Sequence, residues 1–578
     1  MTKRATVLAS VALTVGIATV AAGCGAATTN PPASGATGVQ KGGTIIFALP
    51  PQTNINWYLP VTTAAFDSVY NTQLLNMLYK PLIWINNQYQ IDWKSSIARK
   101  ITYNKQGTVY HVYLNKKWHW SNGQPVTAKD VLFTWNVVKA ASATNAPAPW
   151  PFVGAGTGDI PNGIQSVVQN NPYELTFTLD KPANQQWFIY NGLIQLVPMP
   201  SSVWDIHKNI MNEVKYLGSQ GTNPAIDNVV DGPFKLQKAV SNQEWVLVPN
   251  PQYSGHKSVV NRFVFAFQGS NSSEFAGLRT GAVDVGYLDL SEYGAKGQLT
   301  SNGDKIFAAY PFGMFYTDLN MYPGSNTAPI FDKLYIRQAM QMGIDQPAIN
   351  TDIYHGYAPA QYGPISSTPK TQFLDPNFKN PYPYSIQAAK KLLESHGWHE
   401  VNGVMTKNGQ QLKFQMLYAT GSAAATAAAE LMQTDWAKEG IVVTLKGQPF
   451  STLIGIVSNR KAPNSWQIAT GTGWLYDGPG WYPSGGQLFA TNAPSGYGYS
   501  NAEEDSLIQA THQPYPTNQQ SIKTFYRYAD YTSSQLPFLW NNNPATLVVA
   551  LPTVHDVQQY YNAATGMPQF NYWWISSK

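Results

Sequence analysis

The chain is short of charged residues and of cysteine. Only 12% of its 578 residues are Asp, Glu, Lys or Arg, about half of the usual share. The formal net charge is +5, and no run of basic residues is longer than a pair. Nucleic-acid binding needs clustered Lys and Arg side chains that displace counterions from phosphates, so no nucleic-acid partner is expected. Intrinsic disorder is not expected either, because 43% of the residues are hydrophobic and 13% are aromatic.

A single cysteine, Cys24, excludes a disulfide within the chain and a cluster of thiolate metal ligands. It follows two basic residues and an apolar stretch over residues 5–22, which is the order of a secretory signal. The segment Val20-Ala-Ala-Gly-Cys24 resembles the lipobox of bacterial lipoproteins, although Ala21 stands where Leu is usual. The resemblance implies a signal peptide over residues 1–23 and a lipidated Cys24. A plain secretory signal and an uncleaved membrane anchor are the alternatives.

No later apolar run reaches the ~18 residues that a membrane-spanning helix needs. Residues 24–42 are rich in Gly, Ala, Thr and Pro and have almost nothing to bury, which is typical of a flexible tether. The sequence therefore predicts a folded body that begins at residue 43. It also predicts an extracytoplasmic location, with the lipid anchor holding the body at the membrane.

Strand-like and helix-like patterns alternate along this body. Apolar residues predict strands over residues 43–49, 109–114, 173–179 and 441–445. Capping residues and apolar spacing predict helices that begin after Thr127 and Ser385 and over residues 423–436, and Asn408-Gly409 predicts a hairpin turn. This alternation indicates a mixed α/β fold.

A series of segments in a fixed order resembles the extracytoplasmic solute-binding proteins of family 5, which serve oligopeptide and dipeptide ABC importers. Each segment alone is a weak signal, but their shared order along the chain is a strong one. The segments are Trp120-Ser-Asn-Gly-Gln-Pro-Val-Thr-Ala-Lys-Asp-Val131, Asp231-Gly-Pro-Phe-Lys-Leu236, Asn250-Pro-Gln-Tyr253, Leu278-Arg-Thr-Gly-Ala-Val-Asp284, Ile336-Arg-Gln-Ala-Met-Gln-Met-Gly-Ile-Asp345 and Ala388-Ala-Lys-Lys-Leu-Leu-Glu-Ser-His-Gly-Trp398.

The resemblance implies an α/β fold of the periplasmic-binding-protein-like type II, with two lobes joined by a hinge. The first lobe would be a split core with an inserted subdomain, and the chain would return to it at its end. The implied boundaries are 43–80 and 216–315 for the core of lobe I, 81–215 for the inserted subdomain, 316–535 for lobe II and 536–578 for the return.

The candidate ligand site lies in the segment Gly473-Trp-Leu-Tyr-Asp-Gly-Pro-Gly-Trp-Tyr-Pro483. In the family, an Asp three residues after a Gly-Trp pair holds the amino terminus of the peptide, and Trp474 and Asp477 have that spacing. A desolvated ammonium group needs a carboxylate partner, so an Asp at this position is suited to bind the amino terminus of a peptide. The alternative is that Asp477 only caps the Gly-Pro turn. Trp474, Tyr476 and Trp481 offer aromatic faces for peptide side chains or for sugar rings.

Further ligand contacts are implied on both lobes. Thr62 and Thr63 lie in a loop that would form one wall of the cleft, and Tyr418 and Thr420 would lie on the other wall. The family often has an Arg six residues before its Asp, where this chain has Gly471. Arg460, upstream, is the candidate replacement.

The resemblance implies a monomeric binding protein that captures oligopeptides or dipeptides between its lobes and delivers them to membrane permease subunits, with no cofactor, no metal and no catalytic step. An oligosaccharide, a nickel complex or another small solute is the alternative ligand. A surface-anchored hydrolase is the rival class. The sequence has no G-x-S-x-G and no H-E-x-x-H motif, and His396 and His399 flank the helix stop at Gly397 rather than sharing a helical face.

Overall fold

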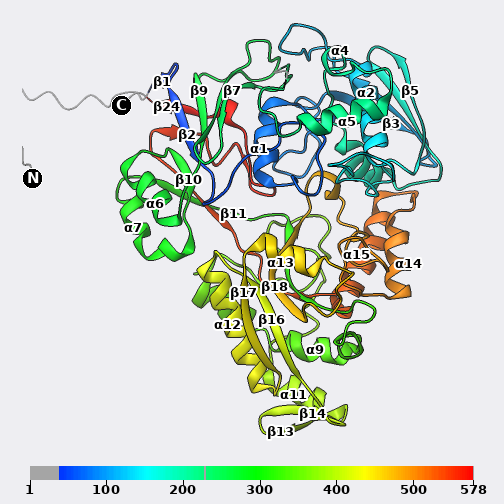
Figure 1. Ribbon diagram of the computed structural model, residues 1–578, viewed down its shortest axis with the longest axis vertical. Coiled ribbons are helices and arrows are strands. Elements are labelled where there is room, and N and C mark those ends of the chain that lie inside the picture. Colours follow the sequence, from blue (N-terminus) through cyan, green and yellow to red (C-terminus); the bar gives the residue numbers. More distant parts are fainter. Residues whose placement is uncertain (1–37, 227–228, 577–578) are drawn as a thin grey trace, which may run out of the picture. The chain divides into compact units, whose positions relative to one another are not determined.

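The computed structural model describes residues 38–226 and 229–576 (Figure 1). The predicted signal peptide, Cys24 and most of the predicted tether lie outside these residues. The last residues of the predicted tether are part of the described structure. There, β1 (Val39–Gln40) pairs with β24 (Trp574–Ser576). The folded body therefore begins at residue 39 rather than 43, because a strand at the end of the chain provides the partner that the local composition could not reveal.

A seven-stranded sheet forms the core of the first lobe. Its order is β11-β20-β10-β2-β9-β8-β7. Strand β2 runs parallel to β9 and β10, and the other neighbours are antiparallel. The bounds are β2 Thr44–Ala48, β7 Phe234–Val240, β8 Glu244–Pro249, β9 Arg262–Ala266, β10 Val285–Tyr287, β11 Lys305–Ala309 and β20 Thr546–Ala550, with α1 Val69–Leu78, α6 Asn271–Thr280 and α7 Lys296–Thr300 beside it.

The inserted subdomain has its own antiparallel sheet in the order β3-β4-β6-β5. Its elements are β3 Ala98–Tyr103, β4 Val109–Leu114, α2 Ala128–Ala141, β5 Ile164–Asn171, β6 Glu174–Leu179, α3 Gln185–Trp187, α4 Ser201–Trp204 and α5 Ile210–Gln220. The predicted capping box is present at the start of α2, where Thr127 and Asp130 cap one another. Helix α5 packs on α2 and continues to Gln220, so the subdomain extends beyond the predicted boundary at residue 215.

The second lobe is built on a five-stranded sheet in the order β17-β16-β18-β12-β19. Strand β16 is parallel to β17 and β18, whereas β12 is antiparallel to β18 and β19. The strands are β12 Gly313–Leu319, β16 Lys413–Ala419, β17 Val442–Gln448, β18 Ile468–Leu475 and β19 Leu539–Trp540. The helices are α8 Ala328–Phe331, α9 Leu334–Met342, α10 Gln346–Ala348, α11 Ile386–Ser395, α12 Ala423–Lys438, α13 Phe450–Val457, α14 Ala502–Thr511 and α15 Asn518–Gln535.

Local sequence signals in this lobe are confirmed. Ser385 accepts a hydrogen bond from the amide of Ala388 and so caps α11. Asn408 and Gly409 both have positive φ angles and turn β14 (Val404–Lys407) into β15 (Gln410–Gln411). The short strand β13 (His399–Val401) completes this small sheet.

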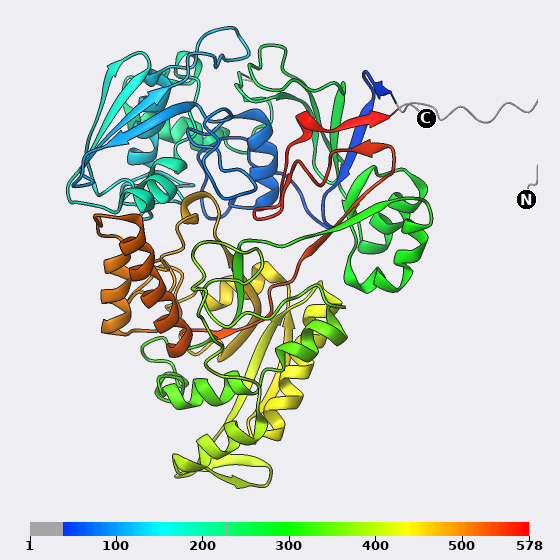
Figure 2. The same ribbon diagram turned by 180° about the vertical axis from the view of Figure 1, so that it is seen from behind.

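Two segments connect the large sheets. Residues 310–312 lead from β11 to β12, and residues 541–545 lead from β19 back to β20. The two segments run close together in both views (Figure 1 and Figure 2). The predicted limits of lobe II, residues 316–535, are too narrow, because Gly313 pairs with Leu475 and Leu539 pairs with Thr317. Short strands close the first lobe: β21 Val554–His555, β22 Tyr561–Asn562 and β23 Met567–Pro568.

None of the helices in the described part of the chain is long and apolar enough to cross a membrane.

Candidate functional site

Asp477 stands just beyond the carboxyl end of β18. The strand runs from Ile468 to Leu475, so Trp474 lies within it, opposite Met314 of β12. Strand β16 runs parallel to β18 and pairs with it only from Ile468 to Thr470. The carboxyl ends of parallel strands are a common place for ligands in α/β folds.

The far half of β18 is therefore an open strand edge. From Thr472 to Leu475 it pairs with β12 on one side, and no strand of the described residues pairs with it on the other. Tyr418 and Thr420 lie at the end of β16 beside this edge, with Tyr418 in register with Thr470. Tyr418 is thus next to the strand that leads to Asp477, and Thr420 directly follows the last residue of β16.

Gly471 marks the point at which the edge opens. The β12–β18 register shifts here, and Gly471 has a φ of +81°, so it forms a β-bulge that a residue with a side chain does not easily adopt. A Cβ atom at this position would lie 3.0 Å from Cβ of Ala419. The Arg that the family pattern often has at this position is thus replaced by a residue that the backbone conformation favours.

The carboxylate of Asp477 accepts a hydrogen bond from its own backbone amide, and no other residue of the described chain pairs with it by an ion pair. The turn over Gly478–Gly480 is closed by the amide of Gly480, which donates to the carbonyl oxygen of Asp477 at 2.6 Å. The side chain makes no capping hydrogen bond, so the turn-cap alternative has no support.

A second carboxylate, Asp67, faces the same region from the first lobe. Burial, together with the negative charge of Asp67, raises the pKa of Asp477 to about 7. The pKa of Asp67 is itself raised by burial. Sequence reasoning missed Asp67, although it directly follows the loop that was predicted to form one wall and precedes Ser68, the N-cap of α1.

That loop is fixed to the inserted subdomain. The carbonyl oxygen of Thr62 accepts a hydrogen bond from the amide of Val153 at 3.0 Å, and Thr63 forms a β-bridge with Phe152. Thr63 is only 2% exposed, and its buried Oγ1 has no hydrogen-bond partner among the described residues. Thr62 is half-buried. Of the two predicted residues, Thr62 therefore has the more accessible side chain.

The predicted aromatic residues divide into two groups. Tyr476 is a core residue, and its hydroxyl donates to the carbonyl oxygen of Pro364 at 2.9 Å. Trp481 is also buried and packs edge-on against Tyr89 of the first lobe. Trp474 is half-buried and is the one with a face left for a ligand.

Arg460 is engaged elsewhere in the second lobe. Its guanidinium donates to the carbonyl oxygens of Ala493, Pro494 and Gly496 and lies over the ring of Tyr322. These contacts hold the guanidinium within the lobe, so they give no support to its predicted ligand role.

The loop that follows Asp477 is clamped to the inserted subdomain. The side-chain amide of Asn191 donates to the carbonyl oxygen of Tyr482 at 2.8 Å, and its Oδ1 accepts from the amide of Tyr482 at 2.8 Å. Asn184 donates to the carbonyl oxygen of Thr511 at 2.9 Å. We call these contacts the Asn191–Tyr482 clamp. No sequence signal indicated them, because each joins residues far apart in the chain.

An aromatic contact accompanies the clamp. Trp187 stacks on His512 with a centroid distance of 4.1 Å. Burial lowers the pKa of His512 to about 3, so the imidazole is neutral, with Nε2 2.8 Å from the hydroxyl of Ser484. The contacts between the inserted subdomain and the second lobe thus include buried aromatic and hydrogen-bonding groups.

Two polar residues of the segment over residues 336–345 make contacts within the second lobe. Arg337 donates to the carbonyl oxygens of Phe331 and Gln535, and Asp345 caps α10. Among the described residues, no three His, Cys, Asp or Glu side chains are grouped so that they could hold a metal ion.

The chain matches a family model and several curated proteins. The model for bacterial extracellular solute-binding proteins, family 5 middle, matches residues 92–495. The oligopeptide-binding protein AppA of Bacillus subtilis (strain 168) is 24% identical over 466 residues, which cover 77% of this chain and 78% of AppA. The oligopeptide-binding protein OppA of Lactococcus lactis subsp. cremoris (strain SK11) is 25% identical over 443 residues, with 70% of this chain and 69% of OppA covered.

Solved structures confirm the predicted fold. AppA of Bacillus subtilis in complex with a nonapeptide superposes with a TM-score of 0.75 at 20% identity, covering 93% of this chain and 100% of that one. NikZ of Campylobacter jejuni in complex with Ni(L-His) gives a TM-score of 0.73 at 18% identity, with coverages of 92% and 99%. The periplasmic EDTA-binding protein EppA gives 0.77 at 15% identity, with coverages of 96% and 100%. One fold thus holds chemically different solutes.

Proposed function

Because this chain belongs to the bacterial extracellular solute-binding proteins of family 5, we propose that it captures peptides between its two lobes for delivery to an ABC permease. The observation that carries the peptide assignment is the carboxylate of Asp477, which has no cationic partner among the described residues and lies at the end of an open strand edge. An extended peptide needs both features: a carboxylate for its ammonium group and an edge for its backbone.

The charge at the site favours a cationic group. Asp477 and Asp67 come from different lobes, and the charge of Asp67 makes ionisation of Asp477 harder. No cation is among the groups that shift the pKa of either residue. The amino terminus of a peptide supplies the missing positive charge and reduces the repulsion between the two carboxylates, which stabilises the closed form.

The strand edge fits the peptide backbone. From Thr472 to Leu475, β18 has its unpaired side next to Tyr418 and Thr420. A peptide laid along this edge pairs through main-chain groups, which every sequence possesses, while its side chains point alternately to the two faces. This mode of binding gives affinity with little dependence on sequence.

An anionic metal chelate is less well matched to this site. EppA binds EDTA, but the carboxylates of Asp477 and Asp67 repel a negative ligand of this kind, and Arg460 is engaged elsewhere. A neutral oligosaccharide has only Trp474 and Tyr418 as partly accessible aromatic side chains among the predicted residues. The peptide assignment therefore fits the charges better than either alternative does.

Attachment and release complete the proposal. Cys24 carries a lipid anchor outside the cytoplasm, the protein acts as a monomer, and permease subunits receive the peptide unaltered. Capture and release need only the opening and closing of the lobes, so no chemical step is part of this function.

The test compares matched peptides. A peptide with a free amino terminus should raise the melting temperature of the purified protein, and its N-acetylated form should raise it far less. Mass spectrometry of the ligand that co-purifies with the protein should find peptides. Equal stabilisation by the free and acetylated peptides would rule out the assigned role of Asp477, and accumulation of cleaved peptide would favour the hydrolase class.

A further inference from the structure

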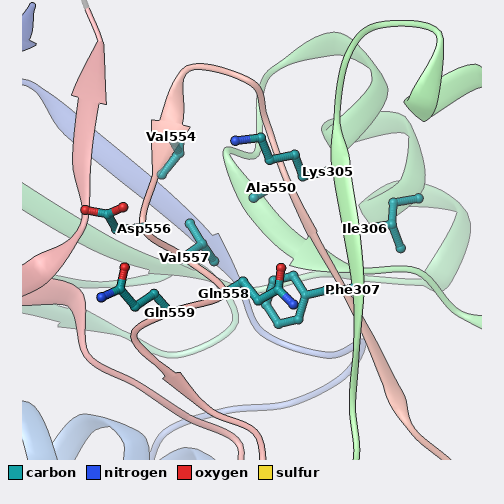
Figure 3. Close-up of a pocket in the computed structure, with 9 residues that line it drawn as sticks. All are labelled: Lys305, Ile306, Phe307, Ala550, Val554, Asp556, Val557, Gln558 and Gln559. Atoms are coloured by element: carbon teal, nitrogen blue, oxygen red, sulfur yellow. The ribbon is translucent and has the colours of Figure 1, made fainter.

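A pocket of about 360 Å³ lies within the first lobe, away from the strand that carries Asp477 (Figure 3). Strand β11, the end of β20 and the segment 554–559 form its walls. All of its lining residues belong to the seven-stranded sheet or to the chain that follows it. Its size is within the usual range of small-molecule sites, roughly 300–1,000 Å³.

The base of the pocket is apolar. Ala550, Val554 and Val557 are buried, and Phe307 is half-buried. Lys305 pairs with Ala550 in the β11–β20 ladder. Phe307, two residues after Lys305, therefore projects from the same face of the sheet, as Figure 3 shows. A hydrocarbon group on this base would leave water without losing a hydrogen bond.

The rim carries one group of each charge. Lys305 and Asp556 are exposed and lie on opposite sides of Val554 (Figure 3). No ion pair of the described residues includes either of them. Gln558 and Gln559, also exposed, add amide groups to the rim.

Asp556 is held in a defined position. Its Oδ2 accepts a hydrogen bond from the indole nitrogen of Trp574 at 2.9 Å, and its backbone has a φ of 65°, a conformation that Asp tolerates better than most residues. Trp574 in turn stacks on His555 with a centroid distance of 3.9 Å. One oxygen of the carboxylate remains for a ligand.

We propose that this pocket binds the zwitterion of a free amino acid with an aliphatic side chain. The ligand carboxylate pairs with Lys305, the ligand ammonium pairs with Asp556, and the side chain lies on Val554, Val557 and Phe307. A simple anion meets repulsion from Asp556, and a simple cation meets repulsion from Lys305. Only a molecule with both charges and an apolar part uses the whole lining.

The experiment titrates L-leucine into the full folded chain and follows Trp574 by ¹⁹F NMR with fluorotryptophan. The Trp574→Phe variant assigns the signal. We expect a saturable shift with a dissociation constant of roughly 1 mM, since few contacts are available. N-acetyl-leucine lacks the ammonium and leucinamide lacks the carboxylate, so each should bind at least about tenfold more weakly.

Matched variants separate this pocket from the peptide site. Lys305→Gln and Asp556→Asn each remove one charge and keep a similar shape, and both should weaken leucine binding at least about tenfold. Lys100→Gln, at an exposed position of the inserted subdomain, is the control for a lost surface charge and should leave binding unchanged. Asp477→Asn should also leave the Trp574 shift unchanged.

Three results would overturn the proposal. The first is no shift of the Trp574 signal at roughly 10 mM leucine, about ten times the expected dissociation constant. The second is a shift that survives both Lys305→Gln and Asp556→Asn. The third is a shift that Asp477→Asn removes, because leucine would then occupy the peptide site. A loss of peptide binding alone would count against the proposed function and not against this pocket.

Discussion

The same tripeptide, Asp-Gly-Pro, occurs at residues 231–233 in the first lobe and at residues 477–479 in the second. Asp231 is fully buried and accepts a hydrogen bond from the amide of Lys80 at 2.9 Å. Burial raises the pKa of Asp231 and lowers that of Lys80, and the opposite charge of each counters the shift of the other. Asp477 has a carboxylate and no cation as its charged neighbour.

The two glycines differ as well. A Cβ atom on Gly232 would lie 2.5 Å from the carbonyl oxygen of Met77, so this glycine permits close packing. Gly478 has open space around it and a φ of +44°. One Asp-Gly-Pro segment is therefore part of a packed interior, and the other is a turn at an open strand edge. A carboxylate that has no cation beside it is therefore a better indication of a ligand site than the Asp-Gly-Pro sequence itself.

The largest expected effect is on stability, from Asp231→Ala. The substitution leaves the buried amide of Lys80 without its acceptor and removes the carboxylate whose charge favours the Lys80 ammonium, which should cost about 3 kcal/mol of unfolding free energy. The melting temperature should fall steeply, whereas the folded fraction should still bind peptide with nearly normal affinity. Thermal unfolding and calorimetry measure the two properties. A normal melting temperature would contradict the structural role of Asp231.

Next in size is the effect of Asp477→Asn on affinity. Loss of the carboxylate should weaken peptide binding by about 2 kcal/mol, or about 30-fold, because a half-buried charge pair is removed. The melting temperature of the empty protein should stay the same or rise, because the variant removes an unfavourable charge. Isothermal titration calorimetry gives the affinity. If the stability of the empty protein fell as much as in Asp231→Ala, Asp477 would have a structural role like that of Asp231.

A smaller effect is expected from pH. The pKa of Asp477 in the empty protein is about 7, and a peptide ammonium favours the ionised form. Affinity should therefore fall by about tenfold from pH 7 to pH 5, as Asp477 takes up a proton. In the empty protein the raised pKa makes the opposite contribution: stability decreases as the pH rises from about 4 to about 7. Asp477→Asn should remove both dependences, and unchanged pH profiles in this variant would contradict the assignment.

The smallest effect is expected from Asp67→Asn. Burial raises the pKa of Asp67, but part of its side chain is exposed to solvent, so its charge is partly screened. Its loss should therefore weaken the binding of a peptide ammonium only about threefold. The pKa of Asp477 should move toward its ordinary value, which a shift of the pH profile of affinity would reveal. An effect as large as that of Asp477→Asn would mean that Asp67 contacts the ligand directly.

Local signals in the sequence predicted the local structure well. Thr127 with Asp130 and the turn at Asn408-Gly409 form their structures through groups that are near in sequence. The type II fold was identified through a resemblance, and the solved structures confirm it. The full length of β18 is hard to predict from sequence, because Gly471 and Gly473 interrupt the apolar pattern of a strand whose partner, β12, is distant in sequence.

The details of the site were harder to predict. Tyr476 and Trp481 were expected to line the cleft, but Pro364 and Tyr89 bury them. Asp67 carries no local signal that separates it from other surface acids. The partners that decide these roles lie hundreds of residues away, and only the folded arrangement brings them together.

The Asn191–Tyr482 clamp has a consequence for unloading. It joins the inserted subdomain to the same short loop that begins at Asp477. A membrane partner that displaced the inserted subdomain would therefore also move the loop that is proposed to hold the peptide, without contacting the peptide itself. Movement of the subdomain would in this way be coupled to peptide release.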